Sequence, residues 1–274
     1  MFINAAHHLK WDLSTPQVMG ILNATPDSFY AQSRVKLEYG ILQKVTQFIH
    51  EGVQVIDVGG QSTRPGANRV DIATEIARVV PVIEMIHHHY PNQLISIDTY
   101  QSDVAKAALI AGAHIVNDIS AGSFDPAILK VVSHYEAGYI GMHLTGSVEN
   151  LHEIEKRTAI LPDLISYFKT KKQEFKKKGL NQWVIDPGFG FGKTLQENFE
   201  LVQKLDQLKE LELPILLGVS RKSAIYKTLG VTPEEALNGT TVLNTVGLLK
   251  GASILRVHDV KEAVELIKLI PFLK

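Results

Sequence analysis

Polar side chains follow short apolar runs at regular places along this chain. Asp98, Asn117 and Asp186 each stand at the end of such a run and offer carboxylate and amide groups. Groups of this kind accept hydrogen bonds, so they suit a ligand rich in N–H donors, such as an aminopyrimidinone ring.

A second set of residues is cationic and lies mainly near the end of the chain. Its members are Lys222, Arg256 and His258, with Arg64 in an earlier segment. Fork-shaped arginine donors match phosphate oxygens. Together the two sets indicate a nitrogen heterocycle that carries phosphate or pyrophosphate.

The elements that must position these residues are short apolar runs alternating with longer amphipathic stretches. We predict eight strands, over residues 17–23, 53–58, 94–98, 114–118, 139–143, 183–186, 214–219 and 253–257. They are continuously apolar, as buried parallel strands are. Apolar spacing and capping residues predict helices between and after them, over residues 36–51, 71–89, 101–111, 125–136, 161–178, 195–211, 233–250 and 260–270.

Eight βα units that recur about every 34 residues favour a (β/α)8 TIM barrel over a doubly wound sheet. We expect residues 1–274 to form a single domain, with residues 2–13 as a short N-terminal hairpin over the barrel floor. Active sites of such barrels lie at the carboxyl ends of the strands. One acidic residue there could be a turn former, but polar residues at all eight ends predict one pocket. We expect it to set four acidic residues against the four basic ones, namely Asp57, Asp98, Asp118 and Asp186.

Composition narrows the function classes. The 274 residues carry 28 Lys+Arg and 29 Asp+Glu, so no global positive field attracts nucleic acid or anionic lipid. The chain has no cysteine, which excludes disulfides, thiolate metal sites and a cysteine nucleophile. It shows no signal-peptide pattern and no apolar run of the ~20 residues that span a membrane. We expect a cytoplasmic enzyme acting on small molecules.

These segments together resemble dihydropteroate synthases. The resemblance covers residues ~17–260 and rests on segments that stand in the family's order: 19–23 with 25–29, 57–60 with 62–66, 96–99, 117–120, 186–193, 220–223 and 256–259. It implies a pterin-binding transferase of folate biosynthesis that joins 4-aminobenzoate to 6-hydroxymethyl-7,8-dihydropterin diphosphate and releases pyrophosphate. It also implies a homodimer formed through the last helices.

The resemblance also implies roles for individual residues. The pterin would be bound by Asp98, Asn117, Asp186 and Lys222, with Met142 and Phe191 as walls. The diphosphate would be held by Arg256, His258 and Asn23, the last together with Mg2+. Ser223 would receive the aminobenzoate carboxylate, and a closing loop would bring Thr63, Arg64 and Pro65 over the site.

The implied mechanism begins with cleavage of the C–O bond to the diphosphate, which leaves a cationic pterin methylene. Mg2+, Arg256 and His258 would stabilise the departing charge, and Asp98 and Asp186 would disperse positive charge in the ring. Lys222 would complete the catalytic set. The aromatic amine then attacks without needing a strong base.

The chain departs from the family pattern in its closing loops. Ala31 stands where an aspartate is usual, and Gln61 replaces a usual glutamate. Two other functions therefore stay open. One is a methyltetrahydrofolate-type pterin methyltransferase, against which Arg256, His258 and the Thr63–Pro65 segment argue. The other is a pterin-binding paralogue without turnover, which Ala31 favours.

Several further motifs have ordinary explanations. Residues 188–194 are glycine-rich, but Pro187 stands where a P-loop needs glycine. Adjacent histidines 87–89 point in different directions on a helix, so we expect a cationic helix end and not a metal site. His143 fits a pocket wall better than a catalytic role. Lys193 could be structural or could polarise the pocket.

Overall fold

The computed structural model describes residues 1–24, 34–61, 69–144, 150–154 and 157–273. Eight of its strands form one parallel sheet: β3 (Gln17–Asn23), β4 (Val55–Gly59), β5 (Leu94–Asp98), β6 (Ile115–Asp118), β7 (Gly138–Met142), β8 (Val184–Asp186), β9 (Leu216–Leu217) and β10 (Ile254–Val257). Their order in the sheet is β8-β7-β6-β5-β4-β3-β10-β9. A parallel bridge between Ile185 and Ile215 joins the two end strands, so the sheet closes into a barrel.

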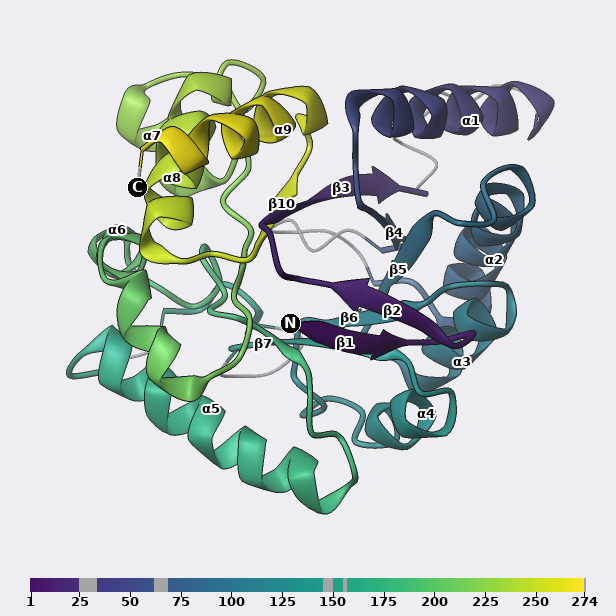
Figure 1. The fold of residues 1–274 in the computed structure, drawn as a ribbon, viewed down its shortest axis with the longest axis horizontal. Helices are drawn as coiled ribbons and strands as arrows, with labels where there is room; N and C mark the ends of the chain where they lie inside the picture. The colour runs from purple at the N-terminus through teal and green to yellow at the C-terminus, as the bar shows by residue number, and fades with distance from the viewer. Residues whose placement is uncertain (25–33, 62–68, 145–149, 155–156, 274) are drawn as a thin grey trace.

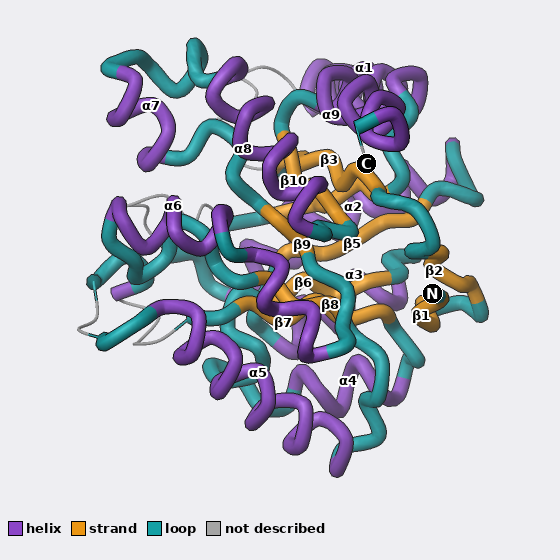
Figure 2. Tube along the Cα trace, turned by 60° about the vertical axis from the view of Figure 1, so that its left-hand side comes forward, coloured by secondary structure: helices purple, strands orange, loops and turns teal. Residues whose placement is uncertain are grey.

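Helices surround this barrel, as Figures 1 and 2 show. They are α1 (Arg34–Glu51), α2 (Ile72–His89), α3 (Ser102–Ile110), α4 (Ile128–His134), α5 (Ile160–Lys177), α6 (Leu195–Gln203), α7 (Ser223–Leu229), α8 (Leu237–Lys250) and α9 (Val260–Leu269). The last of these packs against the first, so the helical layer also closes on itself. The predicted (β/α)8 barrel is confirmed.

Local sequence explains where these helices begin. The Asp71 carboxylate accepts a hydrogen bond from the Thr74 amide and caps α2, and Thr194 and Glu197 form a capping box on α6. Asp125, the first residue of the helix predicted over residues 125–136, accepts from the Ser102 amide at 2.7 Å at the start of α3. The helix that follows it begins only at Ile128.

An antiparallel hairpin, β1 (Phe2–Ala5) and β2 (Leu9–Asp12), lies across the ring of strands in Figure 1. Its Ile3 and Trp11, with the following Leu13, are buried. They pack with an apolar layer inside the barrel, made of Met19, Val55, Ile115, Ile140, Val184, Leu216 and Ile254. The predicted hairpin therefore closes the barrel floor.

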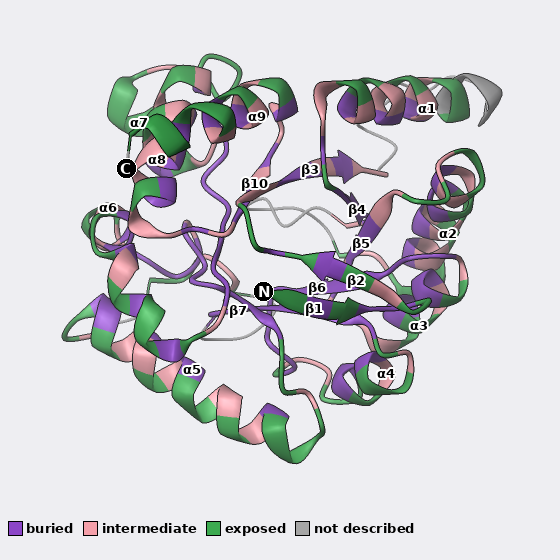
Figure 3. Cartoon of the chain, viewed as in Figure 1, coloured by how far each residue is buried: buried purple, intermediate pink, exposed green. Residues whose placement is uncertain are grey.

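The burial of residues follows the two layers of the fold, the inner strands and the outer helices. Every residue of β4, β6 and β7 is buried, whereas the outer faces of the helices are exposed (Figure 3). This explains why the strands read as continuous apolar runs. Among the described helices, none has the length and apolarity required to cross a membrane.

Three further predicted elements differ from the structure. The helix expected over residues 195–211 ends at Gln203 and continues as a 3-10 helix, Leu205–Leu211. The seventh strand shrinks to Leu216–Leu217, and a short helix, α7, follows it where none was predicted from the residues. The helix expected from residue 233 begins at Leu237, after a turn in which Glu235 accepts from Thr232.

Candidate active site

The barrel interior changes from apolar to polar one layer above the floor. Side chains two residues apart on a strand share a face. Val55, Ile115, Val184 and Ile254 belong to the inner apolar layer. Two residues further along the same four strands stand the residues of the polar layer: Asp57, Asn117, Asp186 and Arg256. Strand periodicity alone therefore brings these residues together inside the barrel.

Arg256 lies between two carboxylates from different strands. Its Nε donates to Asp57 Oδ2 at 2.6 Å, and its Nη2 donates to Asp98 Oδ2 at 2.6 Å. Burial alone would lower the pKa of Arg256, but the two carboxylates outweigh burial and raise it. This guanidinium therefore stays charged at the centre of the site.

Burial in this layer also changes the acidity of Asp98. Burial raises its pKa to about 7; the nearby charge of Asp57 adds to the increase, and Arg256 opposes it. Strand register places Asp98 beside Asn117 on one side and Gly59 on the other. Because Gly59 has no side chain, Asn23 Oδ1 and Asp98 Oδ2 both approach the position that its Cβ would occupy, each at 3.8 Å.

Asp186 and Lys222 form the opposite part of the site. Burial raises the pKa of Asp186, against the effect of Lys222, and lowers the pKa of Lys222 to about 8, against the effect of Asp186. The Lys222 ammonium donates to the Phe189 carbonyl and lies 4.6 Å from the centre of the Phe191 ring. Phe191 shares an apolar cluster with Met142, so the two predicted wall residues are together.

The loops after β9 and β10 meet beside this layer. The His258 amide donates to Ser220 Oγ at 3.1 Å, and that hydroxyl lies 3.0 Å from His258 Nδ1. Arg221 makes a two-point ion pair with Asp259, at 2.9 and 2.7 Å, which ties the two loops to each other. Ser223 is exposed and begins the seven-residue helix α7.

The glycine-rich loop after β8 is held from beneath by Lys193. The buried Nζ of Lys193 donates to the carbonyls of Gly188 and Phe191 at 2.9 and 3.1 Å, and to His143 Nδ1 at 3.2 Å. Burial lowers the pKa of His143 to about 2, helped by the charges of Lys193 and Arg157, so its ring is neutral and accepts. Lys193 thus holds the loop in place, and the His143 ring packs against Tyr167 and Phe168 of α5.

The structure corrects one member of the expected pocket. Asp118 does not face the polar layer, because its neighbour Asn117 does and successive strand residues point to opposite faces. Its carboxylate is fully buried and accepts four hydrogen bonds, two from Ser120 and one each from Gly122 and Tyr139. Asp118 therefore supports the fold on the helix side of β6.

Sequence reasoning also missed two residues that cover the glycine-rich loop. His152 stacks on Phe191 with ring centres 5.2 Å apart and places Nδ1 3.2 Å from the Gly190 carbonyl. Arg157 donates to the Gly192 carbonyl at 3.0 Å. Neither residue belongs to a motif, and two basic residues in a polar segment are the only signal the sequence offered.

Some predicted residues fall outside the described part of the chain. They are Thr63, Arg64, Pro65 and Ala31 of the two closing loops. Gln61 is described, and its buried side-chain oxygen has no hydrogen-bond partner among the described residues. Within the described residues, no group of three or more histidine or acidic side chains is placed to hold a metal ion. His87, His88 and His89 occupy the last turn of α2.

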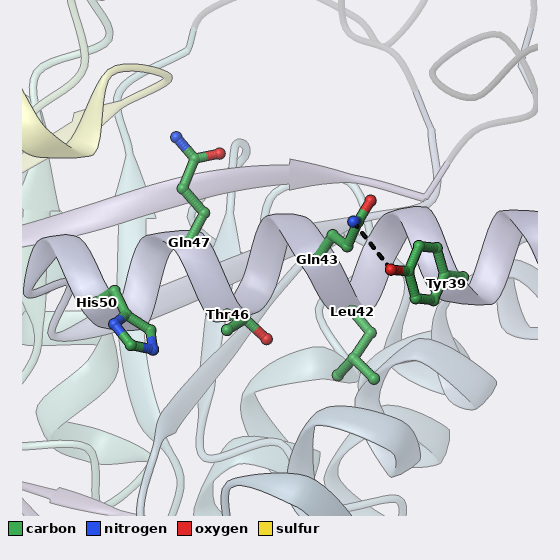
Figure 4. A pocket seen from close by; sticks show the side chains of 6 residues that line it. All are labelled: Tyr39, Leu42, Gln43, Thr46, Gln47 and His50. Atoms are coloured by element: carbon green, nitrogen blue, oxygen red, sulfur yellow. Dashed lines mark hydrogen bonds between the residues drawn. The ribbon is translucent and has the colours of Figure 1, made fainter.

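A hollow on the outer surface of α1 is a different kind of feature (Figure 4). Its lining comes from one helix, and Gln43 donates to the Tyr39 hydroxyl at 3.2 Å across it. It contains no opposed charges, whereas the barrel interior holds four acidic or amide groups around two cations. The site with the capacity for chemistry is therefore the polar layer.

Comparison with known proteins agrees with this geometry. A family model described as "Pterin binding enzyme" matches residues 19–258. This chain belongs to the pterin-binding enzymes. The dihydropteroate synthase of Escherichia coli (strain K12) is 38% identical over 261 residues, which cover 94% of this chain and 92% of that protein. The Streptococcus pyogenes enzyme of the same name is 40% identical over 258 residues, covering 92% and 94%. Within the pterin-binding enzymes, the chain thus falls among the dihydropteroate synthases, transferases of folate synthesis.

Solved structures show the same relationship. A crystal structure of dihydropteroate synthetase with a product has a TM-score of 0.90 and 35% identity, covering 100% of this chain and 99% of that one. The Yersinia pestis dihydropteroate synthase with a sulfonamide drug complex has a TM-score of 0.90 and 36% identity, covering 100% and 98%.

Proposed function

We propose that this chain joins 4-aminobenzoate to 6-hydroxymethyl-7,8-dihydropterin diphosphate, giving 7,8-dihydropteroate and pyrophosphate. The observation that carries the proposal is the polar layer, where Arg256 bridges two carboxylates opposite the pair of Asp186 and Lys222. The carboxylate and amide groups of this layer offer acceptors to a pterin, and Arg256 offers a cationic donor to a diphosphate. We further propose that the chain acts in the cytoplasm as a single pterin-binding domain.

The pterin occupies the polar layer in this proposal. Asp98, Asn117 and Asp186 accept its N–H groups, and Lys222 donates to a ring acceptor. Met142 and Phe191 are its walls. Their shared apolar cluster supports this assignment, because a flat heterocycle needs apolar contact on its faces as well as polar contact at its edge.

The diphosphate lies toward the mouth of the barrel. Arg256 and His258 bind it, and Ser223 receives the aminobenzoate carboxylate, with Thr63, Arg64 and Pro65 closing over both. Asn23 would hold Mg2+, because Asn23 Oδ1 and Asp98 Oδ2 each lie 3.8 Å from the position that a Gly59 Cβ would occupy, and this ion uses few protein oxygens together with substrate phosphate. Bound there, Mg2+ would neutralise charge on the departing pyrophosphate.

The reaction exchanges one bond for another. The C–O bond between the pterin methylene and the diphosphate breaks, and its electron pair leaves with pyrophosphate. Arg256 and His258 stabilise that charge, and Asp98 and Asp186 stabilise the cationic pterin. The amine nitrogen of 4-aminobenzoate then bonds to the methylene and loses a proton. Exclusion of water protects the cation until the amine attacks.

A pH dependence of pterin affinity follows from two shifted groups. Both oxygens of Asp98 accept hydrogen bonds only when its carboxyl is ionised, and its pKa is about 7. Lys222 donates best when protonated, and its pKa is about 8. Affinity should therefore be greatest between these values and decline on both sides, as calorimetry from pH 6 to 9 would show. Lys222→Met should weaken binding and remove the alkaline decline but keep the acidic one; an unchanged wild-type affinity across this range would contradict the assignment.

Turnover tests the proposed function directly. Folded protein is supplied with the pterin diphosphate, 4-aminobenzoate and Mg2+, and dihydropteroate and pyrophosphate are measured. Binding without product would favour a paralogue that has lost turnover, and methyl transfer to a corrinoid would favour the methyltransferase. The Ala31→Asp variant shows whether alanine at this position limits turnover. A large increase in its turnover rate would mean that the reaction benefits from an aspartate there.

We also propose a homodimer formed through the last helices. Val242 and Leu249 on α8 are 54% and 43% exposed, and Phe272, in a C-terminal segment that packs against α8, is 85% exposed. Exposed apolar side chains gathered on neighbouring elements are typical of subunit interfaces. Sedimentation should give twice the chain mass of 30.3 kDa, and Val242→Asp should give the monomer. Exposed Ile110→Asp, on α3, is the control and should leave the dimer intact; a monomeric wild type would contradict the proposal.

A further inference from the structure

Asp57 is the one acidic residue of the polar layer that has no part in the proposed reaction. It stands at the centre of β4 and is fully buried. Its Oδ2 accepts from Arg256 Nε at 2.6 Å and from Asn117 Nδ2 at 3.0 Å. One oxygen atom therefore contacts both a residue assigned to the diphosphate and a residue assigned to the pterin.

The contact with Asn117 decides which way that amide faces. A carboxylate beside a guanidinium only accepts hydrogen bonds, so it can meet only the NH2 group of Asn117. The carbonyl Oδ1 of Asn117 is then left for a different donor. In this way Asp57 makes Asn117 an acceptor toward the ligand, as a ring with N–H groups requires.

The contact of Asp57 with Arg256 fixes the orientation of the guanidinium. Binding of Nε by Asp57 and of Nη2 by Asp98 fixes the plane of the guanidinium from two sides. The Nη1 group is used in neither bond. A fixed guanidinium can meet a phosphate oxygen without losing further side-chain freedom, which favours binding.

The remaining oxygen of Asp57 argues that the residue is not there for stability. Asp57 Oδ1 is buried and has no hydrogen-bond partner among the described residues, and the same holds for Ser96 Oγ on the neighbouring strand. Strand register pairs these two residues directly. A buried polar atom without a partner costs about 1–3 kcal/mol. Such a cost is expected where a residue serves a ligand site.

We propose that Asp57 is a positioning residue, which orients the Asn117 amide toward the pterin and the Arg256 guanidinium toward the diphosphate. The inference rests on the proposed function, because it takes the pterin to bind at Asn117. Its chemistry can still be tested with a ligand that lacks the diphosphate, which separates the two contacts of Asp57.

The test is a double-mutant cycle on the affinity for 6-hydroxymethyl-7,8-dihydropterin, measured by calorimetry. Asp57→Leu and Asn117→Ala should each weaken binding about tenfold or more, the loss that ~1.4 kcal/mol represents. If Asp57 acts through Asn117, the double variant should bind the pterin with about the same affinity as whichever single variant binds it less tightly. Losses that multiply in the double variant would overturn the inference.

Two further variants separate positioning from simple support of the fold. Asp57→Asn keeps an oxygen that can accept from both Asn117 and Arg256. Its affinity for the pterin should therefore stay within about threefold of that of the wild type, where a tenfold change corresponds to 1.4 kcal/mol. Asp118→Asn changes an equally buried aspartate that faces the helices, and should lower the melting temperature without changing affinity. Weakened affinity in Asp118→Asn would mean that any buried aspartate gives the effect, which also counts against the inference.

The diphosphate form of the pterin tests the contact between Asp57 and Arg256 as well. With this ligand, Asp57→Leu should weaken binding more than it does with the alcohol, because Arg256 is now involved; an equal loss would contradict that half of the inference. The wild-type measurement keeps the two proposals apart. If wild-type protein binds neither pterin, the proposed function fails. If it binds both and the cycle is additive, only the role of Asp57 fails.

Discussion

Arg256→Met should reduce turnover by roughly 10²–10³-fold, as loss of one preorganised charge-stabilising donor does in other enzymes. It should also lower the free energy of unfolding by about 3–5 kcal/mol. In the wild-type chain the guanidinium is paired with two carboxylates inside the barrel, and its removal leaves both without this partner. Turnover at saturating substrates and urea unfolding are the two measurements.

The loss of stability in Arg256→Met should depend on pH. Asp98 already has a pKa of about 7, and removal of the neighbouring positive charge raises it further. Its pKa in the unfolded chain is about 4, so between these values the folded state holds a proton that the unfolded state releases. Stability that this proton provides is present at low pH and is lost as pH rises through the folded pKa. The variant should therefore lose less stability at pH 6 than at pH 8.

A matched arginine provides the control for this result. Arg221 also makes a two-point ion pair, but its partner Asp259 keeps 16% of its side chain exposed, against 0% for Asp57. Arg221→Met should therefore cost less free energy of unfolding than Arg256→Met. Equal losses in the two variants, or a loss at Arg256 that does not change with pH, would show that the two carboxylates do not depend on this arginine.

Gly188→Ala should disable the site through the backbone. Gly188 has a φ of +71°, and a Cβ atom there would lie 2.2 Å from the buried His143 carbonyl oxygen. The conformation costs about 1–2 kcal/mol for an L-residue, and the overlap adds about 1–3 kcal/mol. The loop must shift, which removes the bond from the Gly188 amide to Asp186 and disturbs the bonds of Lys193.

Gly230→Ala is the control for that variant. Gly230 has a similar φ of +68°, but no atom of the other described residues, its two chain neighbours aside, lies within 4 Å of the position of its Cβ. It should show only the cost of the conformation, about 1–2 kcal/mol, and should keep pterin affinity. Urea unfolding and calorimetry on both variants check this comparison. Equal affinity in the two variants would mean that the Gly188 loop does not position Asp186.

The fold could be predicted from sequence because its main signals are local and repeated. Buried parallel strands are apolar on both faces, so all eight were visible, and β3 and β5 have the predicted bounds. The elements that differed depend on tertiary contacts. Helix α7 is only seven residues long, and β9 pairs through two residues, so neither has enough length for a periodic pattern.

The site was partly predictable for the same reason. Strand ends indicated the acidic, amide and cationic residues, but not which way each side chain points. Asn117 and Asp118 show the limit: both end the same strand, and only the register of β6 with its neighbours decides that one faces the pocket. The contacts of Asp57, His152 and Arg157 join residues 35 to 199 positions apart, and no local pattern contains them.

The hairpin on the barrel floor has a consequence for the order of folding. Its Trp11 belongs to an apolar cluster that draws on all eight barrel strands, including Ile254 on the last one. The ring also closes through β3 and β10, whose pairing joins residues more than 230 positions apart. The hairpin precedes all eight barrel strands in the chain, so it cannot bury its apolar face completely until β10 has formed. Docking of the hairpin is thus a late event, and burial of Trp11 reports that the ring is complete.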